Sequence, residues 1–600
     1  MHPMGFLSEK SIRRRPTNDS INDLIITGII TLGSIVLLYW WHLDFHDLRP
    51  SGNRNRIYPR GTRDPAYLIK AYNGAVAAEN ELCSKMGVGV LKQGGNAVDA
   101  AISATLCTGV VNMFSSGIGG GGFMIVRLPP ESPGEPSEVW SINFRETAPA
   151  LSNQTMYENN PLGSRYGGLA VGVPGEIRGL QEAHRRWGTI PWKDLVEPAA
   201  KLAARWRVQK ELARRIQMYS SLMLDSPDWS AIFAPQGMLL KEGDRISRAN
   251  YSRTLSIIAE QGPDAFYDGP IADALVEKVR QTGGILTTED LKQYRVRVDK
   301  AFHGTYRGRH VYTNHAPGAG PLLLQMLHVL ENYDLTERTP LNVHRVVETL
   351  KFAFASRTRM SDPASHNDTQ RMEIMMTKEY AHEIYTNITD DKTHPPEYYN
   401  PEYGMKPDHG TSHTSIIDRN GMAVSLTTTV NSVFGCHVLD PTTGMVLNDE
   451  MDDFSVPDTP NDFGLWPSPY NFPLPGKRPV SSTAPTIIEN ADGSIYASIG
   501  GAGGARIFGS ILQVLLNLDW GLDASEAVEF SRLHDQLYPL VLDADEDYPS
   551  ESLEFLRRLG HNVTVADINR IAAVVQLVVK RDGVIYAASD SRKNGIAAGY

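Results

Sequence analysis

Residues 408–431 read Asp-His-Gly-Thr-Ser-His-Thr-Ser-Ile-Ile-Asp-Arg-Asn-Gly-Met-Ala-Val-Ser-Leu-Thr-Thr-Thr-Val-Asn, and the rest of the chain is organised around them. Two β-prone runs, residues 414–418 and 422–430, flank the turn signal Asn420-Gly421, so this stretch predicts a β-hairpin. The Gly410-Thr411 bond precedes the hairpin within a dense group of hydroxyl residues. The pattern alone favours an ordinary surface hairpin, because Thr and Ser are common in strands.

The alternative interpretation of Gly410-Thr411 is an N-terminal threonine nucleophile. A threonine hydroxyl needs an adjacent base, and an α-amino group with a pKa of about 8 supplies one at neutral pH. This state requires the chain to be cut between the two residues. The Thr411 hydroxyl could attack the Gly410 carbonyl, and water would open the resulting ester. Gly410 suits this reaction because a residue without Cβ tolerates a strained backbone.

The composition is that of a globular protein large enough for an extensive core. The chain has 600 residues, with 58 basic and 69 acidic side chains and a net charge of −11. This balance argues against nucleic-acid binding. Its three cysteines, Cys83, Cys107 and Cys436, are too few for a disulfide framework or a cysteine metal cage. Cys83 and Cys107 could pair in an oxidising compartment, which would leave Cys436 as a buried thiol.

The N-terminal region predicts a membrane anchor. Residues 24–41 are uncharged and would span roughly 27 Å as a helix, close to the thickness of a bilayer core. A cleaved signal peptide is the rival interpretation, but Trp40-Trp41-His42 makes a poor cleavage site. The arginines at positions 13–15 predict a cytosolic N-terminus. We therefore expect a type II single-pass protein with a tail at 1–22, an anchor at 23–41, a stalk at 42–65 and an extracytosolic catalytic part, at the cell surface or in the vacuole or secretory lumen.

This topology makes the N-glycosylation sequons plausible sites of modification. They lie at Asn153, Asn250, Asn367, Asn387 and Asn562.

Two glycine runs need separate interpretations. Residues 117–122 formally match a dinucleotide fingerprint, but a strand at 123–128 follows them where that motif needs a helix. Close backbone packing is the better explanation. Residues 500–504 are expected to form a glycine turn between a strand at 494–499 and a helix at 506–518, an arrangement that aims backbone N–H groups at an anion. The P-loop Lys-Ser/Thr is missing, so an oxyanion hole fits better than a nucleotide site.

The remaining polar segments predict no metal and no cofactor. Residues 448–453 hold four carboxylates but lack the ligand spacing of a calcium loop. Ser481 and Ser482 lack a Gly-x-Ser-x-Gly elbow, so neither is expected to be a nucleophile. Residues 174–300 are mostly helical in pattern. Residues 366–410 are polar and contain four prolines, which is the composition of an exposed loop accessible to cleavage.

Several motifs together resemble one known family, the γ-glutamyltranspeptidases of the N-terminal-nucleophile hydrolases. The resemblance extends from about residue 66 to the C-terminus, and its ordered matches are specific. They lie at residues 410–413, 448–454, 475–479 with 481–482, 500–504 and 589–593.

The resemblance implies a fold and a processing event. The expected fold is α/β (α+β), a four-layer αββα sandwich that cleaves itself at Gly410-Thr411. The two parts, residues 66–410 and 411–600, would remain associated and share both central sheets. Family members often carry a disulfide at the positions of Cys83 and Cys107.

The resemblance also implies a mechanism acting on glutathione and other γ-glutamyl compounds. Thr411 would form a γ-glutamyl ester that passes to water, an amino acid or a dipeptide. The other implied roles are Thr429 orienting the nucleophile, Gly503 and Gly504 forming the oxyanion hole, Arg145, Ser481 and Ser482 binding the substrate α-carboxylate, and Asn431, Glu450 and Asp453 binding its α-ammonium.

Two further hypotheses remain beside this one. The first keeps the fold and changes the substrate to that of a cephalosporin-type acylase. Four elements argue against it, namely Arg145, Glu450, Asp453 and the Ser481-Ser482 pair, because a clamp for an amino-acid head group has no use on a dicarboxylate side chain without an amine. The second is an unprocessed, membrane-anchored binding protein, which the Gly410-Thr411 pair disfavours.

Overall fold

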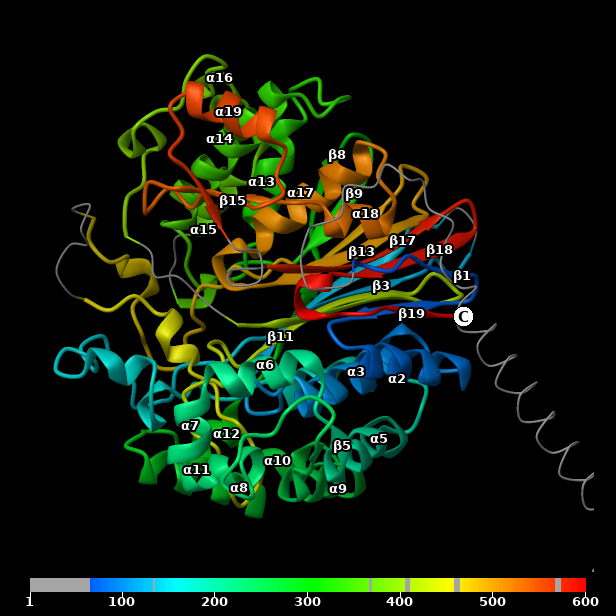
Figure 1. Ribbon diagram of the computed structural model, residues 1–600, viewed down its shortest axis with the longest axis vertical. Helices are drawn as coiled ribbons and strands as arrows, with labels where there is room; N and C mark the ends of the chain where they lie inside the picture. The colour runs from blue at the N-terminus through cyan, green and yellow to red at the C-terminus, as the bar shows by residue number, and fades with distance from the viewer. Residues whose placement is uncertain (1–64, 133–134, 366–368, 405–409, 458–464, 567–572) are drawn as a thin grey trace, which may run out of the picture. The chain divides into compact units, whose positions relative to one another are not determined.

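Two β-sheets lie face to face, with helices over both outer surfaces (Figure 1). The figure shows a computed structural model that describes residues 65–132, 135–365, 369–404, 410–457, 465–566 and 573–600. Within these residues the first sheet has the strand order β1-β18-β17-β13-β12-β9-β8, and the second has the order β19-β2-β10-β11-β3-β4-β7. The layer order is helix, sheet, sheet, helix, which agrees with the expected sandwich.

The strands are short and pair antiparallel within both large sheets. The first sheet contains β1 (Ile69–Ala71), β8 (Phe302–Tyr306), β9 (Arg309–Thr313), β12 (Thr486–Glu489), β13 (Ile495–Ala502), β17 (Val574–Arg581) and β18 (Val584–Ser589). The second contains β2 (Ala75–Ala78), β3 (Gly121–Leu128), β4 (Glu138–Phe144), β7 (Arg297–Lys300), β10 (Ser412–Ile417), β11 (Ala423–Thr429) and β19 (Ala598–Gly599). Smaller sheets contain β5 (Trp206–Arg207) with β6 (Arg245–Ile246), and β14 (Leu533–His534), β15 (Leu542–Asp545) and β16 (Val563–Ala566).

Each outer surface has its own group of helices (Figure 1). The group on the side of the second sheet comprises α2 (Glu81–Lys92), α3 (Ala97–Val111), α4 (Glu176–Trp187), α5 (Trp192–Ala204), α6 (Lys210–Met218), α7 (Ser220–Asp225), α8 (Pro227–Phe233), α9 (Ala249–Gln261), α10 (Asp264–Tyr267), α11 (Pro270–Gln281) and α12 (Thr288–Gln293). The group on the side of the first sheet comprises α13 (Gly320–Leu330), α14 (Pro340–Arg357), α15 (Thr369–Met375), α16 (Lys378–Asn387), α17 (Ile507–Asp519), α18 (Ala524–Glu529) and α19 (Ser550–Arg558).

Both sheets combine strands from the two sides of residue 410. In the second sheet, β10 pairs with β2 on one side and with β11 on the other, and β11 pairs with β3. In the first sheet, β12 pairs with β9, and β18 pairs with β1. The expectation that the central sheets are shared between the segments before and after residue 410 is therefore confirmed. Neither segment alone could satisfy the hydrogen bonds of its inner strands.

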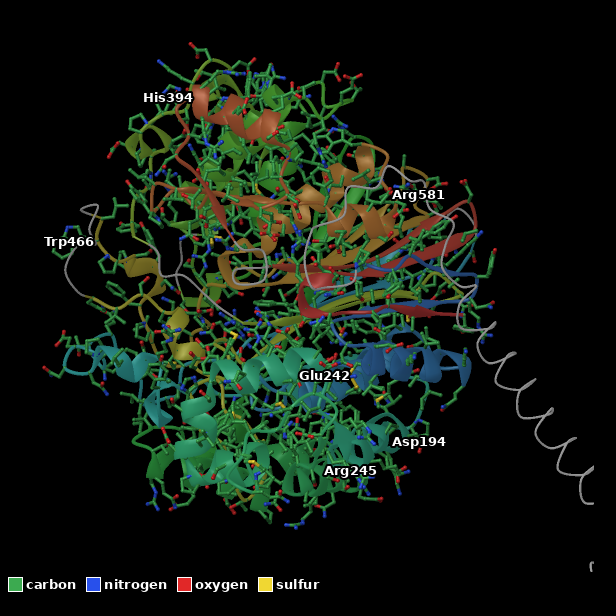
Figure 2. All side chains as sticks on the ribbon, viewed as in Figure 1. Asp194, Glu242, Arg245, His394, Trp466 and Arg581 are labelled. Atoms are coloured by element: carbon green, nitrogen blue, oxygen red, sulfur yellow. A yellow bond between two sulfur atoms is a disulfide. The ribbon has the colours of Figure 1, made fainter. Side chains whose placement is uncertain are left out.

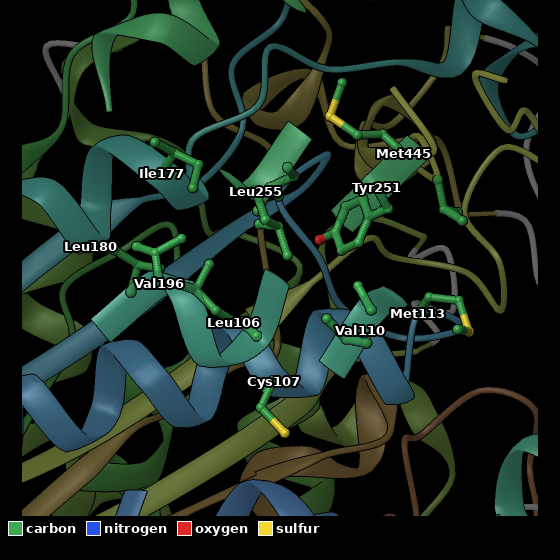
Figure 3. Close-up of a cluster of buried hydrophobic side chains, with 14 of the residues drawn as sticks. Leu106, Cys107, Val110, Met113, Ile177, Leu180, Val196, Tyr251, Leu255 and Met445 are labelled. Carbon is green, nitrogen blue, oxygen red and sulfur yellow. The ribbon is translucent and has the colours of Figure 1, made fainter. Parts of the chain in front are cut away.

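The helical layer beside the second sheet is held by apolar packing around α3 (Figure 3). Every residue of α3 is buried, and its small side chains allow neighbouring elements to approach closely. Leu106 and Val110 of α3 belong to the same cluster as Ile177 of α4, Val196 of α5 and Leu255 of α9. Burying such side chains contributes roughly 1.5–3 kcal/mol each.

The segment before the expected cut differs from the predicted loop. Residues 366–410 include α15 and α16, and Ala381 and Ile384 of α16 are buried. The prediction of one exposed loop was wrong there, because the proline-rich composition near residue 400 masked the helical spacing of apolar residues upstream. Helix α16 begins with Thr377 as its N-cap, whose side chain accepts from the backbone N–H of Tyr380.

The predicted tail and membrane anchor, and all but the last residue of the predicted stalk, lie outside the described residues, as does the sequon at Asn367. In the part of the chain that is described, no helix is both long and apolar enough to cross a bilayer.

Candidate active site

The predicted hairpin forms, but at the centre of the protein. Strands β10 and β11 pair from Ser412↔Thr428 to Ile417↔Ala423, and the Gly421 N–H closes the turn on the Asp418 carbonyl at 3.1 Å. All residues of both strands are buried. The surface-hairpin interpretation is therefore wrong, since neighbouring strands and the opposite sheet cover both faces.

The Gly410-Thr411 peptide bond lies directly before β10. Both residues have positive φ, +90° for Gly410 and +94° for Thr411. A Cβ on Gly410 would lie 1.5 Å from the carbonyl oxygen of Asn431, so only glycine fits there. For a β-branched residue such as Thr411, positive φ is a strained conformation that costs about 1–3 kcal/mol. The bond expected to break is thus held in a strained backbone.

The carbonyl of this bond is already engaged by a glycine amide. The Gly503 N–H donates to the Gly410 carbonyl oxygen at 3.1 Å. Gly503 has φ +124° and connects β13 to the 3₁₀ turn before α17, and Gly504, with φ +61°, is the first residue of that turn. The contact places one predicted oxyanion-hole residue at the carbonyl that would become an oxyanion during self-cleavage.

The glycine run is shorter as a turn than the sequence predicted. Gly500 and Gly501 belong to β13, and the turn begins at Gly503. A Cβ on Gly500 would lie 2.1 Å from the His413 ring of the opposite sheet, so this glycine makes room for an aromatic ring between the sheets. The predicted boundary was wrong because that neighbour is visible only in the folded protein. The glycine run at residues 117–122 packs closely against the backbone, as expected, since a Cβ on Gly120 would lie 1.9 Å from the carbonyl oxygen of Thr429.

The Thr411 hydroxyl lies beside the predicted orienting residue. Its Oγ1 donates to Thr429 Oγ1 at 3.4 Å, and Thr429 Oγ1 also accepts from the Asn431 N–H at 2.8 Å. Asn431 has φ +67°, and its side-chain amide donates to the Asp449 carbonyl at 3.0 Å. This chain of contacts links the threonine to the acidic turn at residues 450–453.

Arg145 lies at the centre of the predicted binding residues. It follows β4 and is 1% exposed, unlike the peripheral Arg245 in Figure 2. Its guanidinium forms hydrogen-bonded ion pairs with Glu450 and Asp453, both in one 3₁₀ turn. The three side chains that were expected to bind opposite ends of a substrate therefore contact one another directly.

The serine pair lies along the same side of Arg145. The Arg145 guanidinium reaches the Pro479 carbonyl at 3.4 Å and the Val480 carbonyl at 3.3 Å. Ser481 and Ser482, the next two residues, are 2% and 0% exposed. Ser481 Oγ lies 3.1 Å from Thr483 Oγ1. Farther upstream in this proline-rich segment, the side chain of Trp466 is 59% exposed (Figure 2).

Three further buried carboxylates lie around this centre, of which the sequence had indicated only Asp449, within the acidic run 448–453. Glu146 lies 4.0 Å from the Arg145 guanidinium, and burial raises its pKa to about 8. Burial likewise raises the pKa of Asp449 to about 8 and that of Glu176 to about 7. For the two that it did not indicate, the adjacency of Glu146 to Arg145 was the one available signal. The raised pKa values of Glu146 and Asp449 favour their protonated, neutral forms at pH 7, which leaves Glu450 and Asp453 as the carboxylates that pair with Arg145.

A separate cluster has metal-ligand residue types. Among the described residues, His344, Glu348 and His561 each place one ligand atom within 4.8 Å of the others. The Lys351 ammonium already lies 3.3 Å from both Glu348 Oε1 and His561 Nδ1. His344 Nδ1 and His561 Nε2 are 2.9 Å apart and satisfy each other. The cluster therefore holds its own cation, which makes it a structural network.

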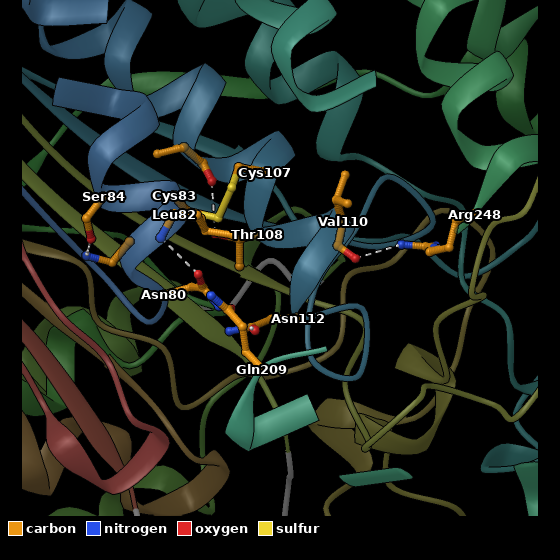
Figure 4. Close-up of a disulfide and its surroundings, with 12 residues drawn as sticks. Asn80, Leu82, Cys83, Ser84, Cys107, Thr108, Val110, Asn112, Gln209 and Arg248 are labelled. Carbon is orange, nitrogen blue, oxygen red and sulfur yellow. Dashed lines mark hydrogen bonds between the residues drawn. A yellow bond between two sulfur atoms is a disulfide. The ribbon is translucent and has the colours of Figure 1, made fainter. Parts of the chain in front are cut away.

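The cysteines behave as expected. Cys83 of α2 and Cys107 of α3 form a disulfide (Figure 4), and Cys436 is a buried free thiol. Of the sequons, Asn153, Asn387 and Asn562 are exposed. Asn250 is partly buried, and its side-chain amide donates to the Pro441 carbonyl.

Comparison with known proteins identifies the class. The sequence model of the Gamma-glutamyltranspeptidase family matches residues 83–600, so the chain belongs to this family, as the motifs suggested. It is 42% identical over 588 residues to glutathione hydrolase proenzyme 1 of Schizosaccharomyces pombe, covering 96% of this chain and 92% of that protein. It is 34% identical to the glutathione hydrolase proenzyme of Escherichia coli, over 90% of this chain and 93% of that protein. It is thus an enzyme of this family.

Solved structures support the fold. The γ-glutamyltranspeptidase of Helicobacter pylori matches with a TM-score of 0.50 and 30% identity, over 53% of this chain and 92% of that chain. A cephalosporin acylase from Bacillus halodurans matches with a TM-score of 0.77 and 24% identity, over 92% of this chain and 99% of that chain. The second likeness is one of fold alone.

Proposed function

We propose that the chain cleaves itself at Gly410-Thr411 and that the freed Thr411 then transfers γ-glutamyl groups. The observation that carries this proposal is the Gly503 N–H on the Gly410 carbonyl, next to a strained Thr411. The Thr411 Oγ attacks the Gly410 carbonyl carbon, the C–N bond breaks, and the hydroxyl proton passes to the departing nitrogen. Water then hydrolyses the ester, which leaves a Gly410 carboxylate and regenerates the Thr411 hydroxyl beside a free α-amino group.

The mature site would repeat this chemistry on a substrate. The α-amino group of Thr411 takes the hydroxyl proton while Oγ attacks the γ-carbonyl of the donor. The backbone N–H groups of Gly503 and Gly504 stabilise the oxyanion, and the leaving amine takes the proton. The γ-glutamyl ester passes to water in hydrolysis, or to the amine of an amino acid or dipeptide in transfer. The relatives' name, glutathione hydrolase, supports glutathione as a donor.

The ion pairs of Arg145 suggest how the donor is recognised. A γ-glutamyl group carries an α-carboxylate and an α-ammonium on one carbon. We propose that this zwitterion inserts into the pairs that Arg145 makes with Glu450 and Asp453. The guanidinium then binds the α-carboxylate together with the Ser481 and Ser482 hydroxyls, while the two carboxylates and Asn431 bind the α-ammonium. Every buried charge keeps a partner, so binding avoids the penalty of an unpaired ion.

The acylase alternative gains no support from the residues around Arg145. Its likeness concerns the fold, whereas Arg145, Glu450 and Asp453 provide charges that complement both charges of an amino acid. A dicarboxylate side chain would leave Glu450 and Asp453 facing a second anion.

We also propose that the catalytic part is extracytosolic, as the N-terminal sequence predicts. The disulfide between Cys83 and Cys107 supports this location, because such bonds persist in oxidising compartments. The exposed sequons at Asn153, Asn387 and Asn562 are consistent with glycosylation there.

The test follows the chain from synthesis to activity. On a denaturing gel we expect two fragments, the smaller of which begins Thr-Ser-His-Thr on N-terminal sequencing, together with hydrolysis of a γ-glutamyl anilide. Thr411→Ala should remain a single chain without activity, whereas Thr411→Ser keeps a hydroxyl and should be cut. Fragments of normal size from Thr411→Ala would overturn the self-cleavage mechanism.

A further inference from the structure

The C-terminal motif at residues 589–593 has no role in the mechanism so far, yet it reaches the nucleophile. Lys593 ends a 3₁₀ turn, Ser591–Lys593, and is 6% exposed. Its Nζ donates to the Thr411 carbonyl oxygen at 2.8 Å. The same Nζ lies 3.2 Å from Glu79 Oε2, and that carboxylate oxygen accepts from Ser412 Oγ at 3.0 Å. Lys593 and Glu79 therefore hold the first two residues of the future N-terminus.

The turn that carries Lys593 is itself fixed by buried ionic contacts. Asp590 caps it by accepting from the Arg592 N–H at 3.0 Å. The Arg592 guanidinium also pairs with Asp590 and with Asp545, and Ser591 Oγ donates to the Glu529 carboxylate at 2.8 Å. Because these contacts already fix the turn, Lys593 loses little further conformational entropy when its ammonium binds the Thr411 carbonyl.

The carbonyl of the scissile bond and the carbonyl of the next peptide bond each accept a hydrogen bond. The Gly410 carbonyl accepts from the Gly503 N–H, and the Thr411 carbonyl accepts from the Lys593 ammonium. Thr411 has a φ of +94°, a conformation that persists only where surrounding contacts enforce it. Without the second hydrogen bond, the peptide after Thr411 could rotate toward an unstrained conformation and take the hydroxyl away from the Gly410 carbonyl.

We propose that Lys593 is a positioning residue for Thr411, held in place by Glu79, and that it sets the rate of self-cleavage and then of acyl transfer. This inference rests on the proposed function and adds a residue to it. Glu79 precedes the cut and Lys593 follows it, so the ion pair joins the two parts beside the nucleophile. After cleavage Thr411 loses its tether to Gly410, and the ammonium on its carbonyl keeps its backbone in place.

The positioning of Lys593 also depends on the negative charge of Glu79. Glu79 is 1% exposed, and its buried carboxylate needs a cation, which Lys593 supplies. Burial raises the pKa of Glu79, while Lys593 and the Ser412 hydroxyl act in the opposite direction. Glu79 contacts Lys593 and Ser412, whereas the Thr411 hydroxyl contacts Thr429, so Glu79 acts on Thr411 through Lys593 and Ser412.

The experiment follows cleavage of the full chain after cell-free synthesis. Lys593→Met keeps the length and removes the ammonium, and we expect cleavage to slow roughly 10- to 100-fold, the value of a charged hydrogen bond. Lys593→Arg keeps the charge and should restore most of the rate. In material that matures, Lys593→Met should lower kcat and leave KM unchanged. Cleavage of Lys593→Met at the wild-type rate would overturn the proposal.

The control separates positioning from loss of a buried charge. Arg127 is also buried and pairs with Glu489, but it supports the turn end of the hairpin through the Gly421 carbonyl at 2.6 Å. Arg127→Met should lower the melting temperature and leave the cleavage rate unchanged. A cleavage rate that follows the melting temperature in both variants would mean that Lys593 is merely structural.

A double-mutant cycle covers the case in which Lys593→Met folds poorly. Glu79→Gln retains the volume and should slow cleavage by less than the lysine variant. The double variant should cleave no more slowly than Lys593→Met, because Glu79 acts mainly through Lys593. Wild-type cleavage in Glu79→Gln, or additive losses, would contradict the inference. A wild-type chain that is never cut, or a Thr411→Ala chain that is cut, would instead overturn the proposed function.

Discussion

The backbone N–H of Gly503 donates to the carbonyl oxygen of Gly410 at 3.1 Å, across 93 positions of the chain. A donor predicted to stabilise an oxyanion from the substrate thus already engages the chain's own scissile carbonyl. Under the proposed mechanism, the Gly410 carbonyl takes the position that the γ-carbonyl of a donor would take later, so one oxyanion site would serve both reactions.

Substitution of Gly503 tests this donor. In Gly503→Ala, the new Cβ would lie 2.5 Å from the Ala573 Cα, and φ +124° is unfavourable for alanine. The loop must shift, so we expect self-cleavage to slow by roughly 10²-fold or more, the usual effect of losing an oxyanion donor. Gly521→Ala is the control, because Gly521 also has positive φ but open space around it. Equal cleavage rates in the two variants would remove Gly503 from the mechanism.

Arg145 is tested by a change that keeps its charge. Arg145→Lys replaces a planar fork by a point charge, so we expect KM for a γ-glutamyl donor to rise roughly 10- to 100-fold. Cleavage should proceed normally, since the contacts of Arg145 lie at Glu450, Asp453 and the 479–480 carbonyls. Arg178→Lys, at a surface pair with Asp264, is the control. An unchanged KM in Arg145→Lys would exclude the arginine from donor binding.

Glu146 predicts a pH dependence of stability. Burial raises its pKa to about 8, so the native protein keeps a proton that the unfolded chain releases above about pH 4.5. The free energy of unfolding should therefore fall as pH rises from 4.5 to 8, by up to ~1.4 kcal/mol per pH unit for this group. Glu176, with its pKa raised to about 7, adds a dependence of the same sign over a narrower range.

Denaturant unfolding of the uncut Thr411→Ala chain at pH 5, 6, 7 and 8 measures this effect. Adding Glu146→Gln should make the slope less steep, because the amide has no proton to release, while Glu176 and Asp449 keep their own contributions of the same sign. Glu158→Gln changes an exposed side chain and should leave the slope as it was. A slope unaffected by Glu146→Gln would show that Glu146 is ionised in the native protein.

The disulfide predicts a sensitivity to reductant. The bridge between Cys83 and Cys107 closes a loop with a sequence separation of 24 residues, for which the loop-entropy estimate is about 3.5 kcal/mol of stability. We expect dithiothreitol to lower the unfolding midpoint of the Thr411→Ala chain. The double variant Cys83→Ala, Cys107→Ala should start from the lower midpoint and not respond to reductant. If dithiothreitol lowered the unfolding midpoint equally with and without the two cysteines, the effect would not come from this disulfide.

The sequence predicted the elements of the fold better than their limits. The hairpin, the strand at 123–128 and the helix at 506–518 followed from apolar spacing and turn residues, which are local signals. The two helices inside residues 366–410 and the length of β13 were missed. The end of β13 depends on the His413 ring packing over Gly500, a contact between opposite sheets.

By itself the sequence determined the family, the residue types that the chemistry needs and the order in which they occur. Only the tertiary structure decided their relations. It showed that Gly410 has no room for a Cβ, that Arg145 pairs with Glu450 and Asp453, and that Lys593 holds the Thr411 carbonyl. The physical reason is that these contacts join residues far apart in the chain, through close approaches and buried charges that form only when both sheets assemble from the two sides of residue 410.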